Sequence, residues 1–141
     1  MKATSRDTKK MVMISYAREN PKTMIAFRDA FLAEGVQAWT DRDIKRGSQN
    51  WQGEVQSAID ACNGHCVLLS PPAKNSSWVG QEIAYSQAQK KKIFPVRIYG
   101  PVGQSVPLAL STAQMDSIAG LEGMRRMKEI KRIVAAIVKA R

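Results

Sequence analysis

The sequence contains few residues that bind metals or form disulfides. Its 141 residues include one histidine, His65, and two cysteines, Cys62 and Cys66. No other Cys or His exists to complete the four-ligand set of a structural zinc site. Cys66 opens an apolar run and is expected in the core, while Cys62 is expected at a helix end. We therefore predict no metal site and no disulfide framework.

Long apolar runs are also missing. The longest wholly apolar run is Ile133–Val138, whereas a membrane-spanning helix needs about 18 to 20 apolar residues. Residues 1–10 contain no apolar stretch of the kind found in a signal peptide. We predict a cytoplasmic protein with one domain over residues 11–141, preceded by a basic tail at residues 1–10.

The formal net charge of +10 raises the question of nucleic-acid binding. The excess is peripheral, however. Residues 1–10 hold four Lys or Arg against one acid, residues 90–92 are three lysines, and residues 121–141 hold seven basic residues against two acids. Such ends are more typical of solvated faces than of a surface that reads a nucleic-acid sequence, although they favour acidic partners or self-association.

Short apolar runs alternate with helical patterns along the chain. This alternation predicts an α/β fold, a flavodoxin-like doubly wound parallel sheet of five strands in the order 2-1-3-4-5 with helices on both faces. The strands are expected at residues 11–16, 36–40, 65–70, 93–98 and, weakly, 113–118. The helices are expected from Pro21 to Gly35, at residues 51–62, at residues 76–90, and in the last twenty residues.

Several local signals support these boundaries. Asn20 and Pro21 are expected to supply a helix N-cap and its first residue. Pro71 and Pro72 are expected to end the third strand. Trp51 begins an amphipathic stripe and is expected to be core. The last helix should bury one apolar stripe, formed by Met124, Met127, Ile130, Ile133, Val134, Ile137 and Val138.

In a sheet of this order, ligands bind outside the carboxyl ends of the strands, where the strand order reverses. That rule selects residues 15–19 and residues 70–82, with the polar loop at residues 41–50 beside them. This crevice has no phosphoacceptor Asp at the end of strand three. The chain also lacks a Gly-rich phosphate loop. A Ser-His-Asp triad would need His65, which begins its strand at the opposite end.

Within the crevice, Trp78 and Glu82 are four residues apart and therefore share one helical face. Trp78 could simply be core, and Glu82 could simply favour the positive end of the helix dipole. As a catalytic group, one carboxylate is too little for ordinary glycoside hydrolysis, which uses two. It suffices for a nicotinamide riboside bond, because the pyridinium leaves as a neutral molecule and the enzyme mainly stabilises the sugar cation.

A set of motifs in this order resembles the TIR (Toll/interleukin-1 receptor) domain family, in its bacterial NAD-cleaving type. The resemblance spans roughly residues 10 to 140. The motifs are Met13-Ile14-Ser15-Tyr16-Ala17-Arg18-Glu19, Ala38-Trp39-Thr40-Asp41, Gly47 through Trp51, Leu68-Leu69-Ser70-Pro71, and Ser77-Trp78-Val79-Gly80-Gln81-Glu82.

The resemblance implies an NAD⁺ glycohydrolase that releases nicotinamide and ADP-ribose or a cyclic ADP-ribose isomer. NAD⁺ would be the substrate, with no cofactor and no metal. The family's Trp-x-x-x-Glu motif makes Glu82 the catalytic residue. The residues expected to bind NAD⁺ are Ser15, Tyr16, Arg18, Asp43, Trp51 and Trp78.

The resemblance also implies that the Asp41–Asn50 loop gates the site and mediates TIR–TIR self-association, in bacterial antiviral defence signalling. Arg46 stands where receptor adaptors often carry proline, which favours the enzyme. Two other interpretations stay open: a TIR interaction module or host-mimicking effector without turnover, and a binder of nucleic acid or membrane surfaces through the basic ends.

Overall fold

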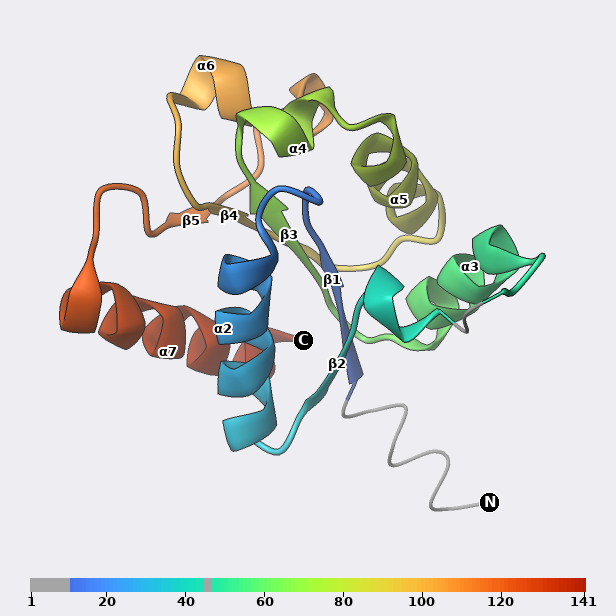
Figure 1. The fold of residues 1–141 in the computed structure, drawn as a ribbon, viewed down its shortest axis with the longest axis horizontal. Coiled ribbons are helices and arrows are strands. Elements are labelled where there is room, and N and C mark those ends of the chain that lie inside the picture. The colour runs from blue at the N-terminus through green and yellow to red at the C-terminus, as the bar shows by residue number, and fades with distance from the viewer. Residues whose placement is uncertain (1–10, 45–46) are drawn as a thin grey trace.

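The centre of the protein is a five-stranded parallel sheet (Figure 1). The structure, a computed structural model, describes residues 11–44 and 47–141. The strand order is β2-β1-β3-β4-β5, which confirms the predicted doubly wound sheet. The strands are β1 (Met11–Ser15), β2 (Gln37–Trp39), β3 (His65–Leu69), β4 (Ile93–Arg97) and β5 (Asp116–Ser117).

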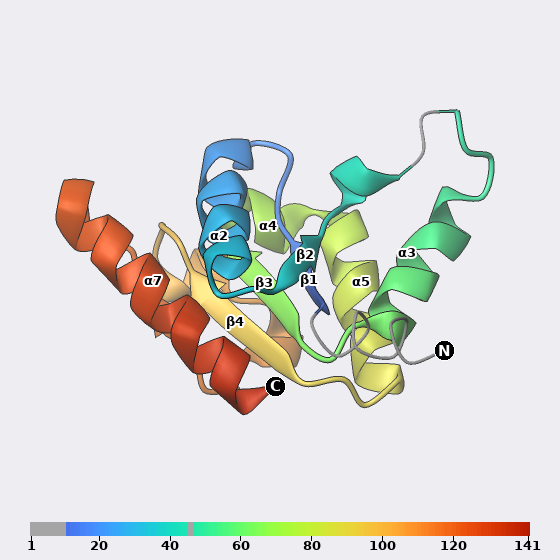
Figure 2. The same cartoon turned by 90° about the horizontal axis from the view of Figure 1, so that it is seen from below.

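Helices cover both faces of this sheet (Figures 1 and 2). On one face lie α2 and α7, and on the other lie α3 and α5. The helices are α2 (Pro21–Ala33), α3 (Trp51–Ala61), α4 (Pro71–Asn75), α5 (Ser77–Ala88), α6 (Val102–Ser105) and α7 (Gly123–Ala140), with short 3₁₀ helices η1 (Asp41–Asp43) and η2 (Leu108–Leu110).

Strand β3 is buried along its whole length and supplies side chains to both faces. Cys66 and Leu68 pack in the core under α2 and α7, whereas Val67 and Leu69 pack against α5. Successive side chains of a strand point to opposite faces, so a two-sided apolar strand is what a central parallel position requires. By the same alternation, His65 lies on the face covered by α3 and α5.

Serine side chains cap two helices at the carboxyl edge of the sheet. Ser76 caps α5 by accepting a hydrogen bond from the Val79 amide at 3.1 Å. Ser70 caps α4 by accepting one from the Ala73 amide at 3.2 Å. Helix α4 was not expected, because Pro71 and Pro72 were interpreted only as the end of a strand. Prolines also suit the first turn of a helix, where the amide hydrogens are unpaired.

Two expectations about helices are confirmed only in part. Asn20 is the N-cap residue of α2 and Pro21 is its first residue, as expected, but the Asn20 side chain makes no capping hydrogen bond. Its Oδ1 instead accepts a hydrogen bond from the Ser70 hydroxyl at 2.9 Å, which ties the β1–α2 loop to α4. The stripe on α7 is buried only from Ile130 onward. Met124 and Met127 are 78% and 46% exposed, because the first turns of α7 project past the sheet (Figure 2).

The basic segment at residues 1–10 lies outside the described residues. So do Lys45 and Arg46 of the predicted gating loop. Over the ranges that the structure does cover, no helix is long and apolar enough to cross a lipid bilayer.

Replacing Gly100 by alanine should destabilise the fold. Gly100 has φ +87°, and an added Cβ would lie 2.6 Å from the side chains of Pro71 and Ser105. We expect a loss of about 1 to 3 kcal/mol in urea unfolding. Gly103→Ala in α6 is the control, because its Cβ would meet nothing within 4 Å. Equal stabilities of the two variants would contradict this close-contact interpretation.

Candidate functional site

Glu82 lies in α5 on the face that packs against the sheet. The helix begins at Ser77, so Trp78, Glu82 and Ser86 follow one another at four-residue spacing along one side. Glu82 is only 4% exposed. It forms no ion pair within residues 11–44 and 47–141. A buried carboxylate without a cationic partner is rare, because removing its charge from water is costly.

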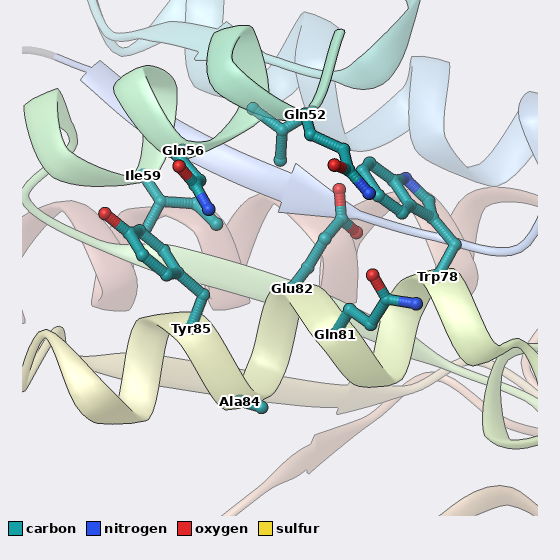
Figure 3. Close-up of a pocket in the computed structure, with 9 residues that line it drawn as sticks. Gln52, Gln56, Ile59, Trp78, Gln81, Glu82, Ala84 and Tyr85 are labelled. Carbon is teal, nitrogen blue, oxygen red and sulfur yellow. The ribbon is translucent and has the colours of Figure 1, made fainter. Parts of the chain in front are cut away.

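A cavity of about 420 Å³ lies between α3 and α5, and Glu82 is part of its wall. Figure 3 shows the Glu82 side chain rising from α5 into the space between the two helices, with the Trp78 indole and the Gln52 amide at one end and Tyr85 and Gln56 at the other. The lining residues are Gln52, Val55, Gln56, Ile59, Trp78, Gln81, Glu82, Ala84 and Tyr85.

A second cavity of about 640 Å³ adjoins the first and shares Trp78 and Gln81 with it. The rings of Trp51 and Trp78 are in contact, with centroids 4.5 Å apart and planes tilted by 54°. This aromatic pair therefore stands where the two cavities meet. The second cavity is lined by Arg18, Asp41, Ile44, Gly47, Ser48, Trp51, Ser76, Ser77, Trp78 and Gln81.

Burial raises the pKa of Glu82 to about 8. The hydroxyl of Ser15 lies against the carboxylate and opposes this shift, because a donated hydrogen bond favours the ionised form. The charge of Asp41 adds to the rise. The desolvation effect is the largest of the three. Glu82 thus titrates close to neutral pH, where a catalytic carboxyl is most useful.

Ser15 and Tyr16 are consecutive residues that point to opposite faces. Ser15 is buried behind Glu82 and lines neither cavity; its Oγ lies 2.6 Å from His65 Nε2. Tyr16 packs in the core under α2 and α7. Burial, with the neighbouring Asp41, raises the pKa of the Tyr16 hydroxyl to about 12. Neither side chain lines a cavity, although the Tyr16 hydroxyl reaches Asp41, which lines the second one.

The other predicted residues divide into two groups. Arg18, Trp51 and Trp78 line the second cavity. Trp51 is 43% exposed, so the expectation that it is core is wrong. Asp43 lines neither cavity and instead closes a capping box, in which its Oδ2 accepts a hydrogen bond from the Thr40 amide at 2.9 Å. The structure thus places Glu82 and Trp78 on the first cavity and Arg18, Trp51 and Trp78 on the adjoining one. Their binding of NAD⁺ stays a prediction.

Sequence reasoning missed most of the cavity's polar lining. Gln52 and Gln56 lie four residues apart on α3, beside its buried stripe, and Gln81 and Tyr85 flank Glu82 on α5. The sequence could have indicated these residues, because positions three or four residues from a buried helical residue lie on or beside the same helix face. Tyr85 donates to Asp60 at 2.9 Å and so joins α5 to α3.

No group of three or more His, Cys, Asp or Glu that could hold a metal ion occurs in the described part of the chain. Cys62 and Cys66 are free thiols and buried. His65 does not form a catalytic triad, because its Nδ1 lies 2.6 Å from the Ser86 hydroxyl rather than from a carboxylate.

Glu82→Gln should make the protein more stable at alkaline pH. The folded state holds the Glu82 proton up to about pH 8, whereas an unfolded chain releases it near pH 4.5. The wild type therefore loses stability as pH rises across that window, by a few kcal/mol in total, and the glutamine variant does not. Urea unfolding between pH 4 and pH 9 measures the difference. Glu122→Gln, at an exposed carboxylate, is the control; a pH-independent difference for Glu82→Gln would contradict a raised pKa.

Three solved structures show a similar fold. The TIR domain of the Toll-related receptor TRR-2 from Hydra magnipapillata is 16% identical, with TM-score 0.73 over 91% of this chain and 97% of that chain. The TIR domains of the activated Roq1 resistosome, which recognises the pathogen effector XopQ, are 16% identical, with TM-score 0.57 over 90% of this chain and 84% of that chain. The diflavin flavoprotein A3 from Nostoc sp. is 11% identical, with TM-score 0.61 over 94% of this chain and 93% of that chain.

The sequence comparison gives the family. No curated protein matches the chain. A family model described as the TIR domain matches residues 12–134, which is most of the chain and includes both cavities and all of α5. The protein belongs to the TIR domain family.

Proposed function

We propose that the protein is an NAD⁺ glycohydrolase that cleaves the bond between nicotinamide and ribose. The observation that carries this proposal is Glu82: a carboxylate almost without solvent contact and without an ion-pair partner among the described residues, placed on a cavity wall beside an indole ring. A protein gains no stability from such a group, so a chemical role is the reason that best fits its presence.

The chemistry needs only one acid. The C1′–N bond breaks, its electron pair leaves with nicotinamide, and the pyridinium becomes a neutral ring without any proton transfer. Positive charge develops on C1′ and the ribose ring oxygen. The ionised Glu82 stabilises that charge and accepts hydrogen bonds from ribose hydroxyls, and it acts strongly because the site is poor in water.

The cation is then captured in one of two ways. Water adds at C1′ and loses a proton to give ADP-ribose, or an adenine nitrogen of the same molecule adds and gives a cyclic isomer. Both products are compatible with the two joined cavities.

The cavities have features that suit a dinucleotide. Trp51 and Trp78 offer aromatic faces to nicotinamide or adenine where the cavities meet. Arg18, on the wall of the second cavity, carries a guanidinium that suits a phosphate group. Each cavity, at about 420 and 640 Å³, falls within the usual range of ligand sites, about 300 to 1,000 Å³.

Regulation would come from self-association. The Asp41–Asn50 loop borders the second cavity through Asp41, Ile44, Gly47 and Ser48, so a partner that moves this loop would also change access to the site. We propose that TIR–TIR contacts through this loop activate the enzyme in the cytoplasm, as part of a bacterial antiviral defence that removes NAD⁺.

An interaction module without turnover is the second candidate. One observation favours it: a groove between α2 and α7 is lined in part by the apolar side chains of Ala30 and Met127, and Met127 is 46% exposed. An exposed apolar groove is typical of a surface that binds proteins.

Nicotinamide release from NAD⁺ tests the enzyme directly. We expect release by the wild type at a concentration where it self-associates, and a loss of about 10²-fold or more in Glu82→Ala, the range seen when a charge-stabilising group is removed. Glu122→Ala is the matched control at an exposed acid and should keep full activity. The interaction module would instead give no release from any variant.

The pH profile tests the role of the carboxylate. Because catalysis needs ionised Glu82 and the pKa of that group is about 8 in the free protein, kcat/KM should rise with pH and level off above about pH 8. A kcat/KM that falls over the same range would mean that Glu82 acts as an acid, and would contradict the proposed mechanism.

A further inference from the structure

Four of the buried polar side chains form one continuous row beneath the first cavity. Ser86 Oγ lies 2.6 Å from His65 Nδ1, and Ser15 Oγ lies 2.6 Å from His65 Nε2. Ser15 also lies against the Glu82 carboxylate. His65 and Ser86 have no solvent exposure at all. The described part of the chain buries seven polar or charged residues, and four of them are in this row.

The surroundings of the row are apolar. On this face the sheet presents Met13 from β1 and Val67 from β3, and α5 adds Ile83. An apolar side chain at position 65 would fit the same layer without needing two hydroxyl partners. A buried polar group is retained at no cost only when every hydrogen bond is made, so this arrangement requires all of its members together.

The imidazole in the middle is neutral, because complete burial lowers the pKa of His65 to about 3. A neutral imidazole has one nitrogen that donates and one that accepts. The two serines therefore cannot play the same role. If one hydroxyl donates to the ring, the other must accept from it, which gives the row a direction.

We propose that Ser86, His65 and Ser15 form a hydrogen-bond relay whose tautomer follows the ionisation of Glu82 and holds its carboxylate in the reactive position. The three are positioning residues, since only Glu82 reaches the cavity. The catalytic meaning of the relay rests on the proposed function, but the relay itself is a property of the free protein.

Two arrangements of the relay are possible. With Glu82 ionised, Ser86 donates to Nδ1, Nε2–H donates to Ser15, and Ser15 donates to the carboxylate. With Glu82 protonated, the carboxyl donates to Ser15, Ser15 donates to Nε2, and Nδ1–H donates to Ser86. The ring carries one proton in both, so its tautomer changes while its charge does not. The proton that Glu82 gains comes from solvent in the cavity. The ring changes tautomer when the row opens transiently: Nε2 releases its proton to solvent and Nδ1 takes one from solvent, so the whole row gains one proton.

Other titratable groups near the row act on Glu82 without touching the ring. Asp41 from η1 faces Glu82 and raises its pKa. Tyr85 lies at the far end of the cavity, bonded to Asp60 of α3, and Arg18 is across the second cavity. The other α3 residues that line the first cavity are glutamines and aliphatics. The lowered pKa of His65 has burial as its cause, with no charged neighbour involved.

The single histidine makes the relay directly observable. In full-length protein labelled with ¹⁵N-histidine, the two ring nitrogens give one pair of signals that report which nitrogen carries the proton. Carboxyl ¹³C signals report Glu82, assigned by their loss in Glu82→Gln. We expect the Nε2–H tautomer above the Glu82 midpoint and the Nδ1–H tautomer below it, with both transitions at the same pH.

Ser86→Ala provides the second test, because Ser86 lines neither cavity. Without its hydroxyl nothing fixes the tautomer, and Ser15 is free to donate to the ring instead of the carboxylate. The Glu82 midpoint should then move to higher pH by about 0.5 to 1 unit, the effect of one hydrogen bond, and the rising limb of kcat/KM should move equally. Ser105→Ala, at a buried serine that donates to the Tyr99 carbonyl, is the matched control and should move neither.

Thermal unfolding checks that each variant folds, and Ser86→Cys, with a weaker donor of similar size, replaces Ser86→Ala if it does not. A ring tautomer that stays constant while Glu82 titrates, or an unmoved midpoint in the Ser86 variant, would overturn the relay. If the relay is observed and no nicotinamide is released, the proposed function is wrong and the relay is not.

Discussion

The burial of one unpaired carboxylate is the constraint on which the site depends. Glu82 is held on the inner face of α5, and the position of that helix is set by apolar packing of Val79 and Ile83 against β3. The core therefore holds the acid against the sheet at the cost of its desolvation. The same desolvation keeps the pKa of Glu82 near 8, within reach of neutral pH. Stability and chemistry thus oppose each other at this residue, as is common where a fold supports a reaction.

The parallel sheet explains why residues so distant in sequence meet at this acid. The order of the strands reverses between β1 and β3, and the segments that follow these strands surround the crevice. Ser15 comes from the end of β1, His65 from the start of β3, and Glu82 from α5, the second helix after β3. Ser15 and His65 lie on the same face of the sheet, the one that α5 covers, because successive side chains of a strand point to opposite faces.

Much of the fold could be predicted from the sequence, because apolar runs and helix signals act locally. The strand order is confirmed, and the helix expected at residues 76–90 is present as α5 (Ser77–Ala88). What failed depends on tertiary contacts. The Asn20 side chain makes no capping hydrogen bond, because its Oδ1 accepts one from Ser70, which is fifty residues away in the sequence. Met124 follows the helical period of α7, but that helix outruns the sheet that would cover it.

The candidate site was predicted in part. Trp78 and Glu82 were expected to share a helix face because they are four residues apart, and the structure has both of them on α5. The orientation of consecutive loop residues does not follow from a motif, so Tyr16 was assigned to the site although it turns into the core. Asp43 was assigned by loop position, whereas local capping uses its carboxylate. His65 was set aside as distant from the crevice, yet its imidazole connects the crevice to Ser86 because the ring is long enough to span that layer.

The most direct measurement is the ionisation of Glu82 in the presence of a carbocyclic analogue of NAD⁺, whose nicotinamide bond is stable. If the acid faces the ribose that carries the pyridinium, the positive charge should lower the pKa of Glu82 clearly below its value in the free protein, while the neutral reduced analogue should not. A Glu82 carboxyl ¹³C titration that is the same with both analogues would contradict the placement of this acid at the reacting bond.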